Sequence, residues 1–287
     1  MIVNTSVKYN SNILKSDINS LMLHYPFINL ITIGYSVLEK PIYCIKLGNG
    51  SKEVFYFGAI HANEWITCNL LMKFIEELCN AYTKNSNIIG YNIRNIFKNV
   101  TFYIVPMSNP DGVDLVNGNI NLNSNAYLYA RYVSNRYPST SFPDGWKANI
   151  KGVDLNLQFP AGWEMARQIK FAQGFTSPAP RDFVGNSYLS ESESLALYNF
   201  TLAHNFSLIL AYHTQGKEIY WQFENYAPER AYTIGQEFSK VSGYTLAEVP
   251  YTSSFAGYKD WFLQEYKRPA YTIEAGLRWK SSSSFSV

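Results

Sequence analysis

Four mostly apolar runs, separated by helical patterns, constrain the fold of this chain more than any other feature. Each run has the length and composition of a strand buried on both faces of a sheet. The runs are VFYFGAI (54–60), VTFYIVP (100–106), SLILAYH (207–213) and PAYTIEAG (269–276). Helical patterns lie between them at residues 65–82, 190–204 and 226–242. Buried strands that alternate with helices predict an α/β fold, a single domain with a mixed, mainly parallel sheet and helices on both faces.

The remaining segments add two expectations. Residues 12–25 show helical spacing, and residues 29–33 and 42–47 have the pattern of short strands. Residues 107–188 lack clear periodicity and are rich in Asn, Gly, Pro and Ser. In a compact domain, a long segment without elements of its own is usually functional. We therefore expect residues 107–188 to form loops over a site.

Composition and charge exclude several classes of protein. Hydrophobic residues make up 47% of the chain and charged residues 16%, which is typical of a globular protein and not of a disordered one. The formal net charge of +2 is too small to indicate nucleic acid or an anionic membrane surface as a partner. No apolar run reaches the ~20 residues that span a bilayer. We expect neither nucleic acid nor a membrane as a partner.

The cysteines and the N-terminal sequence bear on the cellular compartment. Cys44, Cys68 and Cys79 form no CxxC pair, which predicts buried free thiols and not disulfides or a thiolate zinc site. The sequence MIVNTSVKYNSNILKSD has no basic segment followed by an apolar one, so it does not resemble a signal peptide. These features predict a cytoplasmic protein.

Ionisable residues stand at the ends of three of the apolar runs. VFYFGAI continues into His61, SLILAYH ends on His213, and PAYTIEAG carries Glu274 near its end. A polar group at the tip of a buried strand is costly unless it is paired or bound to a metal. Ligands of open α/β sheets collect at the carboxyl ends of the strands. We therefore expect these three side chains to meet at one site.

His61 and Glu64 form an HxxE pair, and His213 can complete a set of two histidines and one glutamate. On a tight turn into a helix, residues three apart lie on one face, so the two side chains can converge on one cation. A catalytic zinc site takes three such ligands and keeps a fourth position open. We predict one zinc ion as the cofactor. In the alternative to a zinc site, His61 and His213 are buried core residues whose ring nitrogens are satisfied by hydrogen bonds and bind no metal. His24 and His204 lie in or at the end of helical segments, where we expect structural roles.

An ordered series of motifs closely resembles the zinc carboxypeptidase family, the carboxypeptidase A-like metallopeptidases. The series comprises a metal-binding turn, a strand-end turn, a substrate-binding segment, a third-ligand strand, an S1′ wall and a general-base strand. In this chain they read GAIHANEW (58–65), SNPDG (108–112), WKANIKGVDLN (146–156), YHTQG (212–216), GYKDW (257–261) and YTIEAG (271–276). Within the family, DLNLQFPAGWE and YHTQGKEIYW most resemble bacterial γ-D-glutamyl-meso-diaminopimelate endopeptidases, which cleave peptidoglycan stem peptides.

The resemblance implies a role for several residues. Glu274 takes the position of the general base, which removes a proton from the attacking water. Lys147 stands where the family carries an arginine that stabilises the oxyanion, and Tyr251 lies near the family's mobile tyrosine, with a one-residue difference in spacing. The alternatives are a salt-bridged carboxylate at the end of a strand for Glu274 and a solvated surface residue for Lys147.

Departures from the family pattern bear on specificity. Typical exocarboxypeptidases read NRN where this chain reads Asn156-Leu157-Gln158. The absent arginine would bind a terminal carboxylate with two hydrogen bonds, and Leu157 cannot do so, whereas Asn156 remains as a polar contact. Lys259, on the S1′ wall, would offer a cation to an acidic or zwitterionic side chain such as that of diaminopimelate.

These features favour a zinc metallopeptidase that hydrolyses the γ-D-glutamyl–meso-diaminopimelate bond, with a muropeptide or peptide as substrate. Two alternatives remain: a general metallocarboxypeptidase, and an inactive, truncated peptide-binding relic. We expect a monomer with one catalytic domain over residues 1–287. Its N-terminal helix and strands would occupy residues 5–50, its catalytic core 51–276, and an atypical tail 277–287. That tail departs from the family pattern, which suggests a truncated C-terminus.

Overall fold

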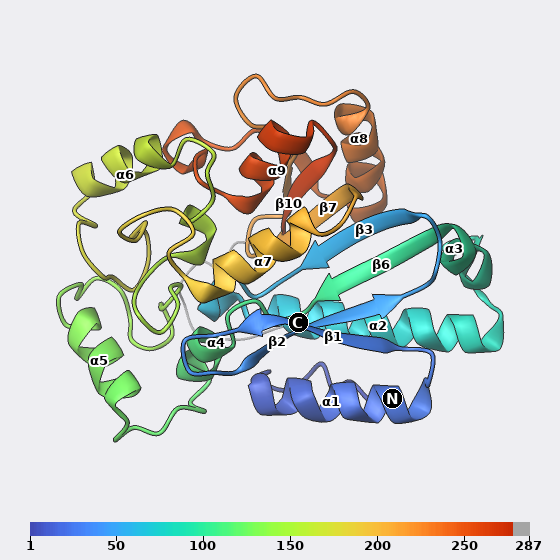
Figure 1. Cartoon of the computed structure of the whole chain (residues 1–287), viewed down its shortest axis with the longest axis horizontal. Helices are drawn as coiled ribbons and strands as arrows, with labels where there is room; N and C mark the ends of the chain where they lie inside the picture. Colours follow the sequence, from blue (N-terminus) through green and yellow to red (C-terminus); the bar gives the residue numbers. More distant parts are fainter. Residues whose placement is uncertain (278–287) are drawn as a thin grey trace.

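An eight-stranded mixed sheet forms the centre of the protein in a computed structural model that describes residues 1–277 (Figure 1). Its strands are β1 (Asn29–Tyr35), β2 (Pro41–Leu47), β3 (Lys52–Phe57), β6 (Val100–Val105), β7 (Phe206–His213), β8 (Glu218–Tyr220), β9 (Thr245–Ala247) and β10 (Ala270–Glu274). The order across the sheet is β1-β2-β6-β3-β7-β10-β8-β9. Two further short strands, β4 (Asn87–Ile88) and β5 (Tyr91–Asn92), pair with each other.

The four apolar runs form the parallel centre of this sheet. β3 pairs in parallel with β6 and with β7, and β7 pairs in parallel with β10. The flanking pairs β1–β2, β2–β6 and β10–β8 are antiparallel, and β8–β9 is parallel. The fold class predicted from the sequence is therefore confirmed. Because β3, β6, β7 and β10 run in one direction, their carboxyl ends lie at the same edge of the sheet.

Helices cover both faces of the sheet (Figure 1). They are α1 (Ser11–His24), α2 (Ile66–Lys84), α3 (Ile93–Asn99), α4 (Pro110–Val116), α5 (Asn125–Ser134), α6 (Trp163–Ala172), α7 (Ser192–Leu202), α8 (Ala231–Ser242) and α9 (Tyr258–Tyr266). Alternate side chains of β3 serve the two faces. Phe55 and Phe57 pack in the core under α7 and α9, whereas Val54 and Tyr56 pack against the core under α1, α2 and α3.

The segment 107–188 contains more regular structure than the sequence predicted, because it includes α4, α5 and α6. Two of these helices begin at side-chain caps: Asn109 accepts a hydrogen bond from Gly112 N, and Ser124 accepts one from Tyr127 N. All three helices are short, at 7 to 10 residues, so an apolar period is difficult to detect in them. The connecting segments contact the turn that follows β3, since Ala62 N donates to Lys147 O and Asp154 Oδ1 lies 3.1 Å from His61 Nε2.

Three smaller expectations can be compared with the structure. Cys44, Cys68 and Cys79 are free and buried, as predicted. Within residues 1–277, no helix has both the length and the apolar character needed to cross a membrane. The predicted atypical tail begins at Leu277, the last described residue, so the rest of that tail lies outside the described part of the chain.

Candidate metal-dependent active site

The carboxyl edge of the central strands brings the predicted site residues together. His213 is the last residue of β7 and Glu274 the last of β10, and the two are partners in the register of these strands. His61 follows β3 and is the N-terminal flanking residue of a short 3₁₀ helix, η1 (Ala62–Glu64). The sheet therefore places residues that are far apart in the sequence at one site.

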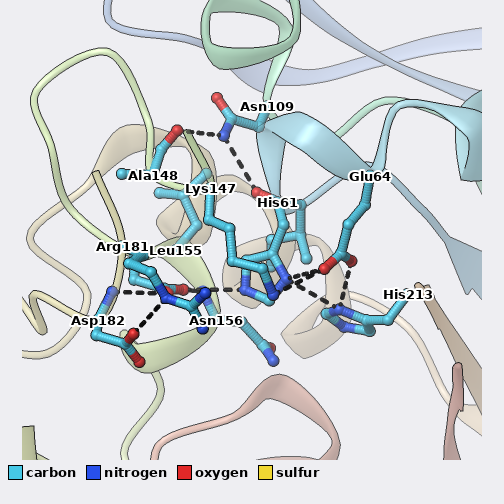
Figure 2. Close-up of polar contacts among 12 residues, drawn as sticks. His61, Glu64, Asn109, Lys147, Ala148, Leu155, Asn156, Arg181, Asp182 and His213 are labelled. Carbon is cyan, nitrogen blue, oxygen red and sulfur yellow. Dashed lines mark hydrogen bonds and ion pairs between the residues drawn. The ribbon is translucent and has the colours of Figure 1, made fainter. Parts of the chain in front are cut away.

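His61, Glu64 and His213 form a cluster of metal-donor atoms (Figure 2). His61 Nδ1 lies 3.0 Å from Glu64 Oε1, and His213 Nδ1 lies 3.0 Å from Glu64 Oε2. The two Nδ1 atoms are 3.2 Å apart. All three residues are buried. Two imidazole nitrogens and one carboxylate facing a common point are the donor set of a catalytic zinc site, so these residues fit one zinc ion.

Asp154 orients the first of these ligands. Its Oδ1 atom lies 3.1 Å from His61 Nε2, on the side of the ring away from the cluster. An Nε2–H that donates to this carboxylate leaves the lone pair of Nδ1 directed at the metal position. Asp154 was not predicted from the sequence, although it is part of the WKANIKGVDLN motif. His213 Nε2 is buried without a hydrogen-bond partner in the described part of the chain.

Attraction between opposite charges in the cluster outweighs the cost of burying them. Burial opposes ionisation, but the carboxylates of Glu64 and Asp154 raise the pKa of His61 to about 9. Against the same burial, Lys147 and His61 hold the pKa of Glu64 well below its usual range. His61 and Lys147 likewise lower the pKa of Asp154. These shifts favour the ionised form of both carboxylates.

The turn that carries His61 is held by hydrogen bonds from two directions. Thr67 Oγ1 accepts from Ala59 N (2.7 Å) and donates to Glu64 O (2.8 Å). Asn109 Nδ2 donates to Ile60 O (3.1 Å) and to Ala148 O (3.0 Å), as Figure 2 shows for Ala148. Asn109, from the SNPDG motif, therefore ties the metal-binding turn to the segment that carries Lys147.

Lys147 lies at the edge of the cluster. Its Nζ atom is 2.9 Å from Glu64 Oε1, and its side chain is 21% exposed. The backbone of the same residue accepts a hydrogen bond from Ala62 N (2.9 Å). The alternative of a solvated surface lysine does not describe this position, because the ammonium is paired with a buried carboxylate.

A cavity of about 260 Å³ opens beside the cluster. Its lining includes His61, His213 and Glu274 together with Lys147. Burial raises the pKa of Glu274, while the neighbouring His213 lowers it. A carboxylate of this kind, close to the metal donors and facing a cavity, has the placement that a general base requires.

Three of the four residues that we expected to contact substrate also line this cavity. They are Asn156, Leu157 and Lys259. Asn156 and Leu157 belong to a second 3₁₀ helix, η2 (Leu155–Leu157), which Asp154 caps. Lys259 is buried, and its Nζ atom donates to Asp260 Oδ1 and to Gln222 O (2.7 Å). The predicted cation is therefore present in the cavity, as one half of a buried ion pair.

Tyr251 occupies a different position. Its side chain is 64% exposed, in the 3₁₀ helix η3 (Tyr251–Ser253), and its ring packs edge-on against Phe255 at 5.1 Å. Within the described chain it is outside the cavity lining, whereas its neighbours Pro250 and Ser253 are part of it. Tyr251 therefore lies beside the cavity, next to two of its lining residues, and its role toward substrate stays a prediction.

Further polar residues of the cavity were not predicted. Arg181, Asp182 and Lys170 form an ionic group on the side of Asp154. No short motif marks them, because their relation to the site depends on the path of the long segment before α7. The sequence indicated these residues only in general terms, through the prediction that residues 107–188 form loops over a site.

Comparisons with known proteins agree with this geometry. The zinc carboxypeptidase family model matches residues 14–279. The chain is 42% identical over 276 residues to "Gamma-D-glutamyl-L-diamino acid endopeptidase 1" of Lysinibacillus sphaericus, covering 96% of this chain and 67% of that one. It is 38% identical over 272 residues to "Uncharacterized protein YqgT" of Bacillus subtilis (strain 168), covering 93% and 70%. The carboxypeptidase A of Helicoverpa armigera has the same fold, with a TM-score of 0.68 at 20% identity over 99% of this chain and 68% of that chain. The chain therefore belongs to the zinc carboxypeptidase family and is a zinc metallopeptidase with one zinc ion as its cofactor.

Proposed function

We propose that this metallopeptidase hydrolyses the γ-D-glutamyl–meso-diaminopimelate bond of peptidoglycan stem peptides. The observation that carries the proposal is a cavity that joins the metal donors to a buried lysine–aspartate pair, Lys259 and Asp260. The name of the relative from Lysinibacillus sphaericus supports the same substrate class. We further expect a monomer to act on muropeptides, since one chain supplies all the residues assigned to the site.

We assign the acid–base step to Glu274. Zinc, when bound by His61, Glu64 and His213, supplies a Lewis acid that acidifies water and polarises a carbonyl. Glu274 accepts the proton of the attacking water and returns it to the nitrogen of the leaving amine. Its position on the lining of the cavity supports this role, because a base must reach both the water and the scissile bond.

We assign the stabilisation of the oxyanion to Lys147. Its ammonium lies 2.9 Å from Glu64 Oε1 and lines the cavity, which supports this role because a cation beside the metal donors can stabilise negative charge on the carbonyl oxygen of a substrate. A lysine acts there as a point charge, without the two-pronged geometry of an arginine.

Specificity follows from Leu157 and from the Lys259–Asp260 pair. Leu157 gives the cavity an apolar side chain where a guanidinium would bind a terminal carboxylate, which disfavours simple exocarboxypeptidase activity. The far end of diaminopimelate carries both a carboxylate and an ammonium. With such a zwitterion, Lys259 can pair with the carboxylate and Asp260 with the ammonium, so both charges of the buried ion pair stay paired. The side chain of L-Lys carries only an ammonium, which would leave Lys259 without an anionic partner.

The test is a comparison of two tripeptides, L-Ala-γ-D-Glu-meso-diaminopimelate and L-Ala-γ-D-Glu-L-Lys, with the zinc-loaded protein. We expect kcat/KM to favour diaminopimelate by roughly 10- to 100-fold, as for one unsatisfied charged partner in a pocket. Lys259→Ala should shrink this preference and leave zinc binding intact. Lys98→Ala, which changes an exposed lysine on α3, is the control and should leave it unchanged.

Two results would contradict the proposed specificity. One is an equal kcat/KM for the two tripeptides. The other is faster hydrolysis of a blocked dipeptide that ends in phenylalanine, which would favour a general metallocarboxypeptidase.

A further inference from the structure

The lysines that line the cavity have their ammonium groups engaged by acidic residues. Lys147 is paired with Glu64 at 2.9 Å, and Lys170 with Asp182 at 2.7 Å. Lys259 is buried against Asp260. A substrate carboxylate that approaches these groups must compete with an anion that is already in place.

Arg181 differs from these lysines. Its Nε atom donates to Asp182 Oδ2 at 2.6 Å, and this is the one hydrogen bond that its guanidinium makes within residues 1–277. The side chain is 45% exposed and lines the cavity. A guanidinium has five N–H donors in a planar fork that matches the two oxygens of a carboxylate. The N–H groups on the Nη atoms of Arg181 are therefore available for a ligand.

The local charge also favours an anion. Asp182 is the shared partner of two cations, with Oδ1 facing Lys170 and Oδ2 facing Arg181. Counted alone, this three-residue group carries one net positive charge at the wall of the cavity, and the carboxylates of Asp154 and Glu64 also act on Arg181. Such a charge attracts anionic ligands.

The backbone around Arg181 is tied to the active site. Pro180 O accepts hydrogen bonds from Lys147 N (2.8 Å) and Ala148 N (2.9 Å). Asp182 N donates to Asp154 Oδ2 at 3.2 Å, and the same carboxylate orients His61. Arg181 therefore lies between the segment of the proposed oxyanion lysine and the residue that supports a metal ligand, and both anchors limit its movement.

We propose that Arg181 binds a carboxylate of the substrate next to the scissile bond. It would supply, from a different segment, the guanidinium that Leu157 does not provide. The inference rests on the proposed function, because a γ-D-glutamyl–diaminopimelate bond can have a free carboxylate on either side. One is the α-carboxylate of D-Glu. The other is the α-carboxylate of diaminopimelate when that residue ends the peptide.

The test compares Arg181→Ala and Arg181→Lys with the unaltered zinc-loaded protein on three peptides. The first is L-Ala-γ-D-Glu-meso-diaminopimelate, and each of the others carries a carboxamide in place of one of the two α-carboxylates. Arg131→Ala, which changes an exposed arginine of α5, is the matched control. Melting curves show whether each variant remains folded.

We expect Arg181→Ala to lower kcat/KM for the first peptide by roughly 10- to 100-fold, the loss of a charged two-pronged contact. In the unaltered protein, amidation of the bound carboxylate should cause a loss of similar size, and in Arg181→Ala the same amidation should have little further effect. One of the two amidations should thus slow the unaltered protein but not Arg181→Ala. The carboxylate that this amidation removes is the one that Arg181 binds. Arg181→Lys should recover only part of the rate, because lysine keeps the charge and loses the fork.

A binding measurement gives a second readout. In a Glu274→Gln background, which prevents turnover, calorimetry with the first peptide should show a loss of affinity of similar size for Arg181→Ala. The inference is overturned if both amidations retain their full effect in Arg181→Ala, or if that variant matches Arg131→Ala in rate and affinity.

Failure of the proposed function gives a different result. If the unaltered protein hydrolyses α-peptides and no γ-glutamyl peptide, the substrate assignment is wrong. In that case the unaltered protein and Arg181→Ala are compared on a blocked α-dipeptide that ends in either a free carboxylate or a carboxamide. This comparison then decides whether Arg181 binds the carboxylate.

Discussion

At the scale of single residues, the metal donors depend on one another. His61, Glu64 and His213 are buried, and their donor atoms contact each other at 3.0–3.2 Å. Buried imidazoles and carboxylates are stable only when they are paired or bound to a cation. Removing one member therefore changes the environment of the other two as well as the number of ligands.

We expect His61→Ala or His213→Ala to abolish tight zinc binding, because two remaining ligands cannot complete a catalytic site. Elemental analysis of the purified variants measures this directly. His24→Ala is the control, since His24 is exposed at the end of α1 and should leave one zinc per chain. Stoichiometric zinc in the double variant of His61 and His213 would exclude these residues as ligands.

We expect Glu274→Gln to keep the metal and to lose roughly 10²–10⁴ in kcat, which is the range for one acid–base group. Glutamine keeps the shape of the side chain but cannot accept the proton of the water. Steady-state kinetics together with zinc content separate this effect from metal loss. Turnover near that of the unaltered protein would place the base elsewhere.

At the scale of elements, the site depends on how loops after different strands are joined. Asn109 caps α4 through its Oδ1 atom. Its Nδ2 atom donates one hydrogen bond to the turn after β3 and another to the segment before η2. It is fully buried. One amide therefore serves as a cap and as a connection between two loops.

We expect Asn109→Asp to reduce the free energy of unfolding by about 2–3 kcal/mol, because it keeps the cap but turns two donations into repulsion between buried oxygens. Chemical denaturation measures the change, and zinc affinity should fall with it. The matched control is Asn92→Asp, at the cap of α3, where the side chain is exposed enough that the change should stay within about 0.5 kcal/mol. Equal effects at the two positions would show that the connection between the loops contributes nothing.

At the scale of the whole molecule, a buried acidic group couples stability to pH. Glu193, in the first turn of α7, has no exposed surface, and its Oε1 atom has no partner in the described part of the chain. Asn149 Nδ2 donates to Glu191 Oε2 (2.8 Å) and to Glu193 Oε2 (3.4 Å). Burial, with added repulsion from Asp111 and Glu191, raises the pKa of Glu193 to about 7 from its ordinary value of 4.5.

This shift predicts a loss of stability as the pH rises. Between pH 4.5 and about 7 the folded protein retains a proton on Glu193 that the unfolded chain has released, so the free energy of unfolding falls across this window. The contribution of Glu193 is about 3 kcal/mol, fully present below pH 4.5 and lost above pH 7. Glu193→Gln mimics the protonated form and should remove this part of the pH dependence.

Urea denaturation at several pH values measures the effect as the difference between the unaltered protein and Glu193→Gln. The variant should be the more stable of the two at pH 8, and the difference should vanish near pH 4. Glu237→Gln, on the exposed side of α8, serves as the control and should follow the unaltered protein at every pH. A constant difference across the pH range would show that Glu193 does not titrate in this window.

The sequence by itself determined the central strands and the residues at their ends. A strand buried on both faces needs a continuous apolar run, and such runs are local features of the sequence. His61 and Glu64 could also be recognised locally, since one turn places residues three apart on the same face. The parallel direction of the strands then implied that His213 and Glu274 would reach the same edge.

The tertiary structure alone decided the surroundings of these residues. Asp154 reaches His61, and Asp182 reaches Asp154, through contacts that join residues distant in the chain. Arg181 lines the cavity because the preceding residue, Pro180, accepts backbone hydrogen bonds from Lys147 and Ala148. Such contacts depend on the path of irregular segments, whose conformation has no sequence period to reveal it. Local patterns reveal His61 and Glu64, whereas the residues that surround the metal donors are set by packing between loops.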